Sequence, residues 1–428
     1  MFSRINLLSI YNKEILKMNN VLVLTTTYPK SREDIVPSFI YDQIQSLTDL
    51  KKDVNFIVLA PHYFDNFTID QLNYKQIRYH YFWPFRFEKL VGRGIIPTIK
   101  KNKLYILLVP FFITAQIFVA IKFSIKFKPK VIYAHWFFPQ AIVAFIVSKI
   151  TNIPYVFTTH AYDAGILNKI PILGNYISRV VISNAYKYTA VSQNTLEILH
   201  SVFKKNVNNN NSKVLPMPVN LVSNELVDDE TKKIFNDYKS IKNKFLFIGR
   251  FAEKKGLINL IEIFNELNKN FPHFVLFIAG DGPEKSKIQK LIHKHNLDKK
   301  IIILNYLNIS QKIYAFDFVD FVVIPSIKTK FGDIEGLPVV LLESLYLGKI
   351  TISSKYSNSA EIVEDSANGF IFDPLKIENS KEIFLKIINL EESKKRQIIQ
   401  NAEQTGKNYS KNSNGLLHYN HLFRDILK

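Results

Sequence analysis

Short apolar runs alternate with longer amphipathic stretches along this chain, and the alternation occurs twice. In the first half, residues 21–25, 54–60, 131–134 and 154–158 have the length and apolar character of buried strands, and residues 36–50 and 141–150 have the pattern of helices. Strands that alternate with helices are typical of a parallel sheet with helices on both faces. We therefore predict an α/β fold with doubly wound topology.

The same alternation restarts after a polar, low-complexity break at residues 206–212. Strands are expected at residues 244–248, 274–279, 301–304, 321–324 and 350–353, and helices at residues 257–268 and 416–427. A chain of 428 residues suits two domains. We expect a first Rossmann-like domain over residues 1–214, a second over residues 215–405, and a final segment over residues 406–428 whose helix returns to the first domain.

The chain has no cysteine, which excludes disulfides, thiolate metal ligands and cysteine nucleophiles and fits a cytoplasmic location. No secretory signal is visible, and Met18 is a candidate start because the first clear strand begins near residue 20. The net charge is +19, with 26 basic against 11 acidic residues in 1–214 (+15) and 30 against 26 in 215–428 (+4). No acidic residue lies between Lys89 and Tyr162. An anionic membrane surface is one partner that such a basic region could attract.

An uncharged run of eighteen residues, 104–121, lies inside this basic region. Its length permits a marginal transmembrane helix, a shallow membrane-contacting helix or a buried helix of the α/β fold. We expect the buried helix, because Pro110 interrupts the run and Thr114 and Gln116 lie within it. A membrane contact would place the protein peripherally on the inner face of the plasma membrane.

Three loops of the second half follow predicted strands, where ligands bind in open parallel sheets. The first loop carries Gly249, Arg250 and Lys255, and fixed positive charge near a helix start suits a diphosphate. The second contains Gly280 and Gly282, which permit a tight turn. The third, residues 325–343, contains Asp333, Glu335, Gly336, Leu337 and Glu343. Each loop alone is also consistent with an ordinary surface turn.

Together these loops resemble the retaining family-4 glycosyltransferases of the GT-B fold, in which two Rossmann-like domains face a central cleft. Glu335 and Glu343 match the family's E-x7-E motif, and Gly249, Arg250, Lys255 and Gly256 match its G-R-x4-K-G element. Residues 280–283 match a G-x-G-P turn, and residues 359–374 resemble the family's E-I-V-x-D-x-x-N-G-F segment. The loop at residues 354–361 lacks the glycines that the family usually has there.

The first half adds two matches. His135 ends a predicted strand, and residues 159–163, which include His160 and Asp163, resemble the family's T-H-G-x-D. A single histidine is often structural, and that interpretation stays open for His135. Tyr28, His135 and Asp163 are candidates for acceptor binding.

The resemblance implies a role for each matched residue. Arg250 and Lys255 would hold the donor diphosphate, Glu343 the ribose and Glu335 the transferred sugar. The amides of Gly336 and Leu337 would also bind the donor, and the donor-binding site would include Gly249, Gly280, Gly282 and Asp333. His160 would contact the sugar or the leaving phosphate. Glu335, His160, Arg250 and Lys255 form the expected catalytic set. No cofactor or metal is implied, and the chain lacks a D-x-D metal motif.

The expected activity is therefore transfer of a hexose from a UDP- or GDP-sugar to a glycan or lipid-linked acceptor, with bacterial surface-polysaccharide assembly as the family-level setting. Two alternatives are kept. A nucleotide-sugar epimerase or phosphorylase shares the two-domain plan, and the net charge of +19 would also suit a non-catalytic polyanion-binding protein. No nucleic acid partner is expected, because the basic residues follow no recognisable nucleic-acid-binding motif.

Overall fold

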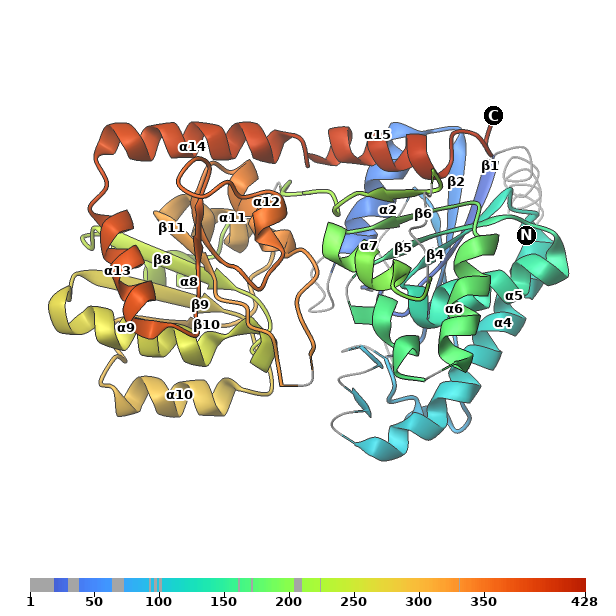
Figure 1. The fold of residues 1–428 in the computed structure, drawn as a ribbon, viewed down its shortest axis with the longest axis horizontal. Helices are drawn as coiled ribbons and strands as arrows, with labels where there is room; N and C mark the ends of the chain where they lie inside the picture. Colours follow the sequence, from blue (N-terminus) through green and yellow to red (C-terminus); the bar gives the residue numbers. More distant parts are fainter. Residues whose placement is uncertain are drawn as a thin grey trace, which may run out of the picture. The chain divides into compact units, whose positions relative to one another are not determined.

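The computed structural model describes residues 19–29, 38–63, 73–91, 94–95, 98–99, 102–160, 162–170, 172–203, 210–223, 225–330 and 332–428. The candidate start at Met18 and part of the polar break at residues 206–212 lie outside these residues. The chain forms two compact units (Figure 1). One comprises the residues up to Pro218 together with Lys411–Lys428, and the other comprises Val219–Ser410.

The first unit is built on a seven-stranded parallel sheet with the order β3-β2-β1-β4-β5-β6-β7. Side chains alternate between the two faces of each strand. Leu22 and Leu24 pack with α4 to α7, whereas Val21 and Val23 pack with α2 and α15. The strands are β1 (Asn19–Leu24), β2 (Val54–Pro61), β3 (Lys75–Tyr79), β4 (Val131–His135), β5 (Tyr155–Thr159), β6 (Lys187–Ala190) and β7 (Ser212–Val214). The helices are α2 (Phe39–Leu50), α4 (Leu108–Phe127), α5 (Ile142–Thr151), α6 (Leu173–Asn184), α7 (Gln193–His200) and α15 (Lys411–Leu422).

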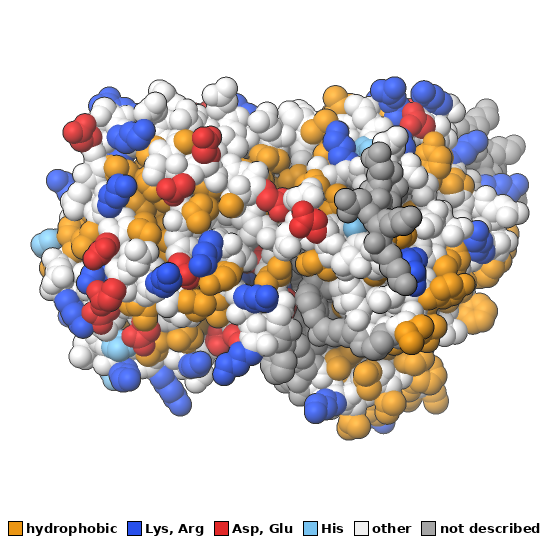
Figure 2. Space-filling model, in the orientation of Figure 1, with side chains coloured by type: hydrophobic (Ala, Val, Ile, Leu, Met, Phe, Trp, Pro, Cys, Tyr) orange, Lys and Arg blue, Asp and Glu red, His pale blue; other side chains and the backbone are white. Residues whose placement is uncertain are grey.

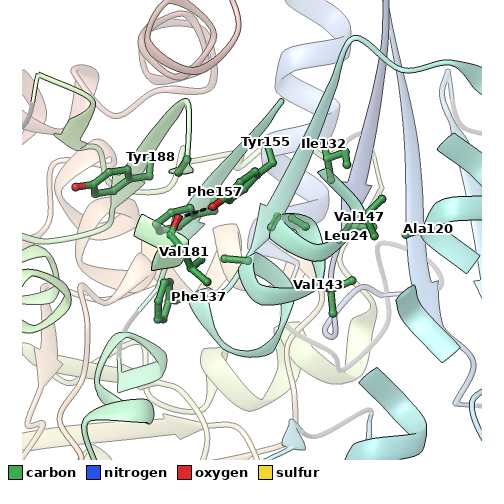
Figure 3. Close-up of a cluster of buried hydrophobic side chains, with 14 of the residues drawn as sticks. Leu24, Ala120, Ile132, Phe137, Val143, Val147, Tyr155, Phe157, Val181 and Tyr188 are labelled. Carbon is green, nitrogen blue, oxygen red and sulfur yellow. Dashed lines mark hydrogen bonds between the residues drawn. The ribbon is translucent and has the colours of Figure 1, made fainter. Parts of the chain in front are cut away.

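Figure 3 shows part of the core between this sheet and the α4 to α7 side. Val143 and Val147 of α5 lie among Leu24, Ala120 and Ile132, and the rings of Phe157 and Tyr188 stack with centroids 4.9 Å apart. The Tyr155 hydroxyl donates to the carbonyl of Val181, which joins β5 to α6. This packing fixes the carboxyl ends of β4 and β5, where His135 and His160 lie.

The second unit has a six-stranded parallel sheet with the order β10-β9-β8-β11-β12-β13. Helices α9, α10 and α13 cover one face, and α8, α11 and α12 the other. The strands are β8 (Asn243–Ile248), β9 (Phe274–Ala279), β10 (Ile301–Leu304), β11 (Phe321–Ile324), β12 (Ile350–Ser354) and β13 (Phe370–Phe372). The helices are α8 (Asp229–Asn236), α9 (Leu257–Asn270), α10 (Lys285–Lys294), α11 (Ile309–Phe318), α12 (Val339–Tyr346), α13 (Ile377–Ile388) and α14 (Glu392–Lys407).

In both sheets the order in which consecutive strands are added reverses once, although all the strands are parallel. Chain order runs outward from β1 through β2 to β3 and then restarts at β4 on the other side; β8 and β11 repeat this arrangement in the second unit. Ligands in doubly wound folds bind beyond the carboxyl ends of the strands at this switch point. A ligand site in the second unit is therefore expected at the loops that follow β8 and β11.

The C-terminal helix begins and ends five residues earlier than predicted. α15 spans Lys411–Leu422, whereas the apolar pattern indicated residues 416–427. The helix packs in the first unit: the Ser46 hydroxyl donates to the carbonyl of Lys411 at 2.6 Å, and Lys411 pairs with Asp49 at 2.5 Å. Phe423, just after the helix, lies against Tyr133 with ring centroids 5.2 Å apart. The apolar residues beyond Leu422 belong to a buried turn, which periodicity alone cannot distinguish from a helix.

The expectation that residues 104–121 form a buried helix is correct for one side only: the segment is helical and buries Leu108, Phe112, Gln116 and Ala120, but most of its other side chains are not buried. These residues lie in a continuous helical segment, Lys103–Phe127. In the most apolar stretch of 18 residues within this segment, only 17% is buried. Pro110 does not break it, because it lies in the first turn of α4, where a missing N–H costs no helical hydrogen bond. By length and composition this is the one helix in the described chain that could cross a membrane.

Candidate active site

The loop after β8 carries the two expected phosphate-binding side chains. Arg250 is half-buried directly after the strand, and Lys255 lies in a short 3-10 turn, Glu253–Lys255. Gly256 follows with φ +67° and begins α9. A Cβ atom on Gly256 would lie 1.9 Å from the carbonyl oxygen of Pro325. Only glycine therefore lets the start of α9 approach the loop after β11 so closely.

The glycines of the turn after β9 serve the packing of loop on loop. A Cβ atom on Gly280 would lie 2.0 Å from the carbonyl oxygen of Gly249, and one on Gly282 would lie 2.3 Å from that of Phe251. The backbone amide of Phe251 donates to the backbone carbonyl of Asp281 at 2.9 Å. The sequence indicated a tight turn at these glycines, and in the structure they also make room for the neighbouring loop.

An ion pair joins the loop after β8 to the loop after β11. Lys255 Nζ contacts Glu335 Oε1, and Ser326 donates to Glu335 Oε2 at 2.6 Å. Burial alone would raise the pKa of Glu335, but the charges of Lys255 and Lys254 and the bonds from Lys255 and Ser326 together lower it. Glu335 is therefore an ionised acceptor held beside a cation.

A second contact shapes the rest of the same loop. Lys254 Nζ lies 3.5 Å from Asp333 Oδ1, and the amide of Asp333 donates to the Thr329 hydroxyl at 3.0 Å. The backbone carbonyl of Lys254 accepts from Ile327 at 2.9 Å. Asp333 thus helps to attach the loop after β11 to the loop after β8.

Asn358 organises the same region, although sequence analysis did not single out this residue. Its side-chain amide donates to the carbonyls of Glu335 at 2.9 Å and Gly336 at 2.7 Å. Because the C=O and N–H of a trans peptide point in opposite directions, this turns the amides of Gly336 and Leu337 the other way. Those two amides have no acceptor among the described residues. The one hint was that the loop at residues 354–361 lacks glycine; in the structure Asn358 of this loop adopts a left-handed conformation, φ +54°.

Glu343 lies in the second turn of α12 and is buried. Lys312 of α11 pairs with its Oε1 at 2.5 Å, while its Oε2 has no partner among the described residues. A buried carboxylate oxygen without a hydrogen bond is costly. The arrangement suits a hydroxyl donor from a ligand. The pairing with Lys312 was not predicted, because it depends on two helices meeting.

The first unit brings two predicted histidines together. Nδ1 of His135 lies 3.2 Å from Nε2 of His160, and the rings stack with centroids 5.4 Å apart. Trp136 and Phe39 flank the His160 ring at 4.6 and 5.0 Å. Trp136 has φ +84°, a strained conformation for a large side chain.

Asp163 holds this loop in place. Its carboxylate accepts from the amide of Phe137 at 2.6 Å, the hydroxyl of Thr159 at 2.9 Å and the amide of His160 at 3.2 Å. These bonds connect the ends of β4 and β5 and help to fix the strained backbone at Trp136. Asp163 therefore has a structural role within residues 159–163, since its carboxylate bonds to neighbouring residues of the first unit.

Both histidines are neutral at pH 7. Burial, followed by the nearby His418, lowers the pKa of His160 to about 3. Burial, His160 and His418 likewise lower the pKa of His135 far below its usual value. His160 can therefore donate or accept a hydrogen bond but brings no positive charge. Tyr28, the remaining acceptor candidate, lies elsewhere in the core, where its hydroxyl bonds that of Tyr74 at 2.5 Å.

One group among the described residues has the composition of a metal site: His62, His80 and Glu88, in the first unit. Glu88 is already bonded by His80 Nδ1 at 2.8 Å and by the amides of Tyr81 and Phe82. These hydrogen bonds compensate for the burial of the Glu88 carboxylate.

Comparison with known proteins supports the same interpretation. A model described as Glycosyl transferases group 1 matches residues 228–405, and one described as Glycosyltransferase Family 4 matches residues 38–222. An uncharacterized glycosyltransferase of Methanocaldococcus jannaschii, MJ1178, is 29% identical over 281 residues, which cover 65% of this chain and 70% of that protein. The putative colanic acid biosynthesis glycosyltransferase WcaL of Salmonella typhimurium is 30% identical over 128 residues, 30% of this chain and 32% of that protein.

Solved structures show the fold. Sucrose-phosphate synthase from Thermosynechococcus elongatus superposes with a TM-score of 0.72 at 14% identity, covering 94% of this chain and 98% of that one. Anabaena HepE in complex with UDP and glucose superposes with a TM-score of 0.65 at 16% identity, covering 94% and 98%. Together with the two matched family models, these likenesses support a glycosyltransferase that has the GT-B fold and is similar to family 4.

Proposed function

We propose that this protein is a retaining hexosyltransferase that uses a UDP- or GDP-sugar and passes the sugar to a glycan or lipid-linked acceptor. The observation that carries the proposal is the Lys255–Glu335 pair at the switch point of the second sheet, beside the amides of Gly336 and Leu337, which have no acceptor in the described part of the chain. A cation, an anion and free N–H groups within one small site can bind a diphosphate and sugar hydroxyls at the same time.

Donor binding would rearrange the ion pair. The diphosphate would replace Glu335 as the partner of Lys255, and the carboxylate of Glu335 would become available to the sugar. Arg250 and the amides of Gly336 and Leu337 would add to the phosphate contacts, and the unpartnered oxygen of Glu343 would accept from the ribose. As the bond from C1 to the phosphate oxygen breaks, charge grows on the leaving diphosphate. Lys255 and Arg250 would stabilise that charge, often the largest single contribution to catalysis.

The acceptor step then needs no enzyme nucleophile. The acceptor oxygen would bond to C1 on the face that the diphosphate leaves, and its proton would pass to the leaving phosphate. His160, neutral and hydrogen-bonded to His135, would supply a hydrogen bond to the sugar or phosphate. No metal is assigned to these steps, because lysine, arginine and amides provide the positive groups.

The setting of surface-polysaccharide assembly is supported by the relatives' names. WcaL is named for colanic acid biosynthesis, and HepE was solved with UDP and glucose. A UDP-sugar is therefore the first donor to test.

The test is product analysis with candidate donors and a lipid-linked or saccharide acceptor, in EDTA. A retaining transferase yields a new glycoside with the donor's anomeric configuration, read by NMR. A glycoside of inverted configuration would contradict retention. Conversion of the donor without any acceptor product would favour an epimerase, and a requirement for phosphate in place of a sugar acceptor would favour a phosphorylase.

A further inference from the structure

Helix α4 presents an apolar stripe to the outside of the first unit. Phe111, Phe118 and Ile125 recur every seven residues and are 53%, 69% and 69% exposed. Residues seven apart lie on nearly the same face of a helix. The stripe continues into the preceding 3-10 turn, Lys103–Leu107, through the exposed side chains of Leu104 and Leu107. An exposed apolar face of this length marks an interaction surface.

The inward face of the same helix contains both apolar and polar side chains. Gln116 and Ser124 are buried, and Gln140 of the neighbouring turn donates to Gln116 Oε1 at 3.2 Å. Leu108, Phe112 and Ala120 pack in the core on this same side. The helix is thus attached to the sheet along one side. It cannot cross a bilayer without leaving this core, so it can only lie on a surface.

An aromatic loop extends the apolar face. Phe82 packs edge-on against Phe111 with ring centroids 5.0 Å apart, and the residues that follow it expose Trp83, Phe85 and Phe87. Trp83 is 78% exposed. Glu88 fixes the base of the loop by accepting the amides of Tyr81 and Phe82. We call the exposed residues of this loop and of α4 with its 3-10 turn the apolar face: Trp83, Phe85, Phe87, Leu104, Ile106, Leu107, Phe111, Phe118 and Ile125.

Basic side chains accompany the apolar face, and acidic ones do not. Among the described residues, Arg86, Lys89, Lys103, Lys122 and Lys126 are exposed in the same segments. No acidic residue occurs between Lys89 and Tyr162, and Glu88 is buried. Figure 2 shows hydrophobic side chains with basic ones near them over the part of the first unit where Figure 1 draws α4.

We infer that the apolar face docks on an anionic lipid bilayer, with the aromatic and aliphatic side chains in the interfacial layer and the lysines against the headgroups. Tryptophan and phenylalanine favour this layer, and each basic residue near an anionic surface adds attraction. A second copy of the chain is a poorer occupant, because two such faces would bring like charges together. The inference goes beyond the proposed function, which concerns the reaction and not where the protein sits.

The test uses the full chain and vesicles of phosphatidylglycerol or of phosphatidylcholine. Wild-type protein should float with the phosphatidylglycerol vesicles at low salt, and bind phosphatidylcholine and high-salt samples far more weakly. The variant Phe111→Ser/Phe118→Ser/Ile125→Ser should lose more than about tenfold in partition, because these side chains supply the buried apolar area. Lys122→Glu/Lys126→Glu should lose at least about thirtyfold in partition on the anionic vesicles alone, because each lysine near the surface contributes about 1 kcal/mol.

Matched controls come from exposed residues of the second unit. Leu226→Ser/Leu375→Ser removes two exposed apolar side chains, and Lys290→Glu/Lys294→Glu reverses two exposed charges; both should bind as wild type. Trp83 reports insertion directly: its fluorescence should shift to the blue and be quenched by brominated lipid, and Trp83→Phe should remove that signal. Circular dichroism and thermal melts show whether each variant is folded.

Three outcomes would overturn the inference. Wild-type protein could stay unbound at low salt, the control variants could lose binding as much as the α4 variants, or Trp83 could be insensitive to lipid. Analytical ultracentrifugation decides the rival occupant. A wild-type dimer that the Phe111/Phe118/Ile125 variant abolishes, without vesicle binding, would assign the apolar face to a second copy.

Discussion

Lys255 Nζ and the carboxylate of Glu335 are paired across two loops that lie 80 residues apart in the chain. Glu335 is buried with a lowered pKa, and Lys255 is its main counter-charge. The pair therefore joins stability to the proposed chemistry, since the donor diphosphate would compete for the same lysine.

The two partners should differ in what their loss costs. Lys255→Met leaves a buried carboxylate with weaker compensation, so we expect a loss of about 3–5 kcal/mol in the free energy of unfolding of the second unit. Glu335→Gln keeps the shape and leaves a lysine that can turn to solvent, so the loss should be about 1 kcal/mol. Urea unfolding measures both. Lys255→Met/Glu335→Gln should recover part of the loss, and equal losses for the two single variants would contradict a desolvated pair.

Asn358 should act on donor binding through the peptides it holds. Asn358→Gly keeps the left-handed backbone available but removes the bonds to the carbonyls of Glu335 and Gly336. We expect nucleotide affinity to fall about tenfold, since two bonds that orient the amides are lost. Calorimetric titration measures it. Asn152→Gly, at an exposed residue with φ +56°, serves as the matched control and should bind as wild type. An unchanged affinity for Asn358→Gly would remove its positioning role.

Gly256 and Gly332 form a matched pair for the close approach of the loops. Both have positive φ, +67° and +76°, but a Cβ atom on Gly256 would strike Pro325 whereas one on Gly332 meets nothing within 4 Å. Gly332→Ala should cost about 1–2 kcal/mol, the ordinary strain of a left-handed residue. Gly256→Ala should cost roughly 3 kcal/mol or more and weaken nucleotide binding, because the loops must separate. Thermal melts compare the stability of the two variants. Equal losses of stability would show that the close approach of Gly256 to Pro325 is not needed.

Buried histidines should make the first unit sensitive to acid. Burial lowers the pKa of His160 to about 3 and of His418 to about 4, below the usual value of 6.5, so the folded state resists protons that the unfolded state takes up. Their contribution is present above pH 6.5 and is lost as pH falls towards 4, at about 1.4 kcal/mol per pH unit for each histidine. Urea midpoints between pH 7 and 5 should fall less steeply in His418→Gln. His293→Gln, at a histidine with an 85% exposed side chain, should leave the slope unchanged. A wild-type slope of zero would contradict neutral buried histidines.

The strands of the second unit could be predicted because their apolar runs are short and bounded. β9, β10 and β11 begin and end where the sequence indicated. A helix was expected over residues 104–121, where α4 lies, but its exposed side was not predicted, since apolar residues occur on both sides and periodicity then identifies no face. The pairing of Lys312 with Glu343 and of Asn358 with residues 335 and 336 depends on segments 22 to 31 residues apart. Such contacts arise only from the folded chain, so local pattern cannot reveal them.

The glycines give a related lesson. The motif at residues 280–282 indicates a tight turn, because glycine can adopt backbone conformations that other residues avoid. The structure uses these positions to bring Gly280 and Gly282 against the backbone of residues 249 and 251. These two glycines therefore hold the turn after β9 against the loop that carries Lys255.

The central claim is that the second unit binds the nucleotide part of a sugar donor through Lys255. The most direct measurement is calorimetric titration of wild type, Lys255→Met and the exposed control Lys290→Met with UDP, GDP, ADP and CMP in EDTA. The account predicts that one nucleoside diphosphate, UDP or GDP, binds wild type and Lys290→Met equally and binds Lys255→Met at least about tenfold more weakly. Equal binding by all three proteins, or no binding of any nucleotide to the wild type, would contradict it.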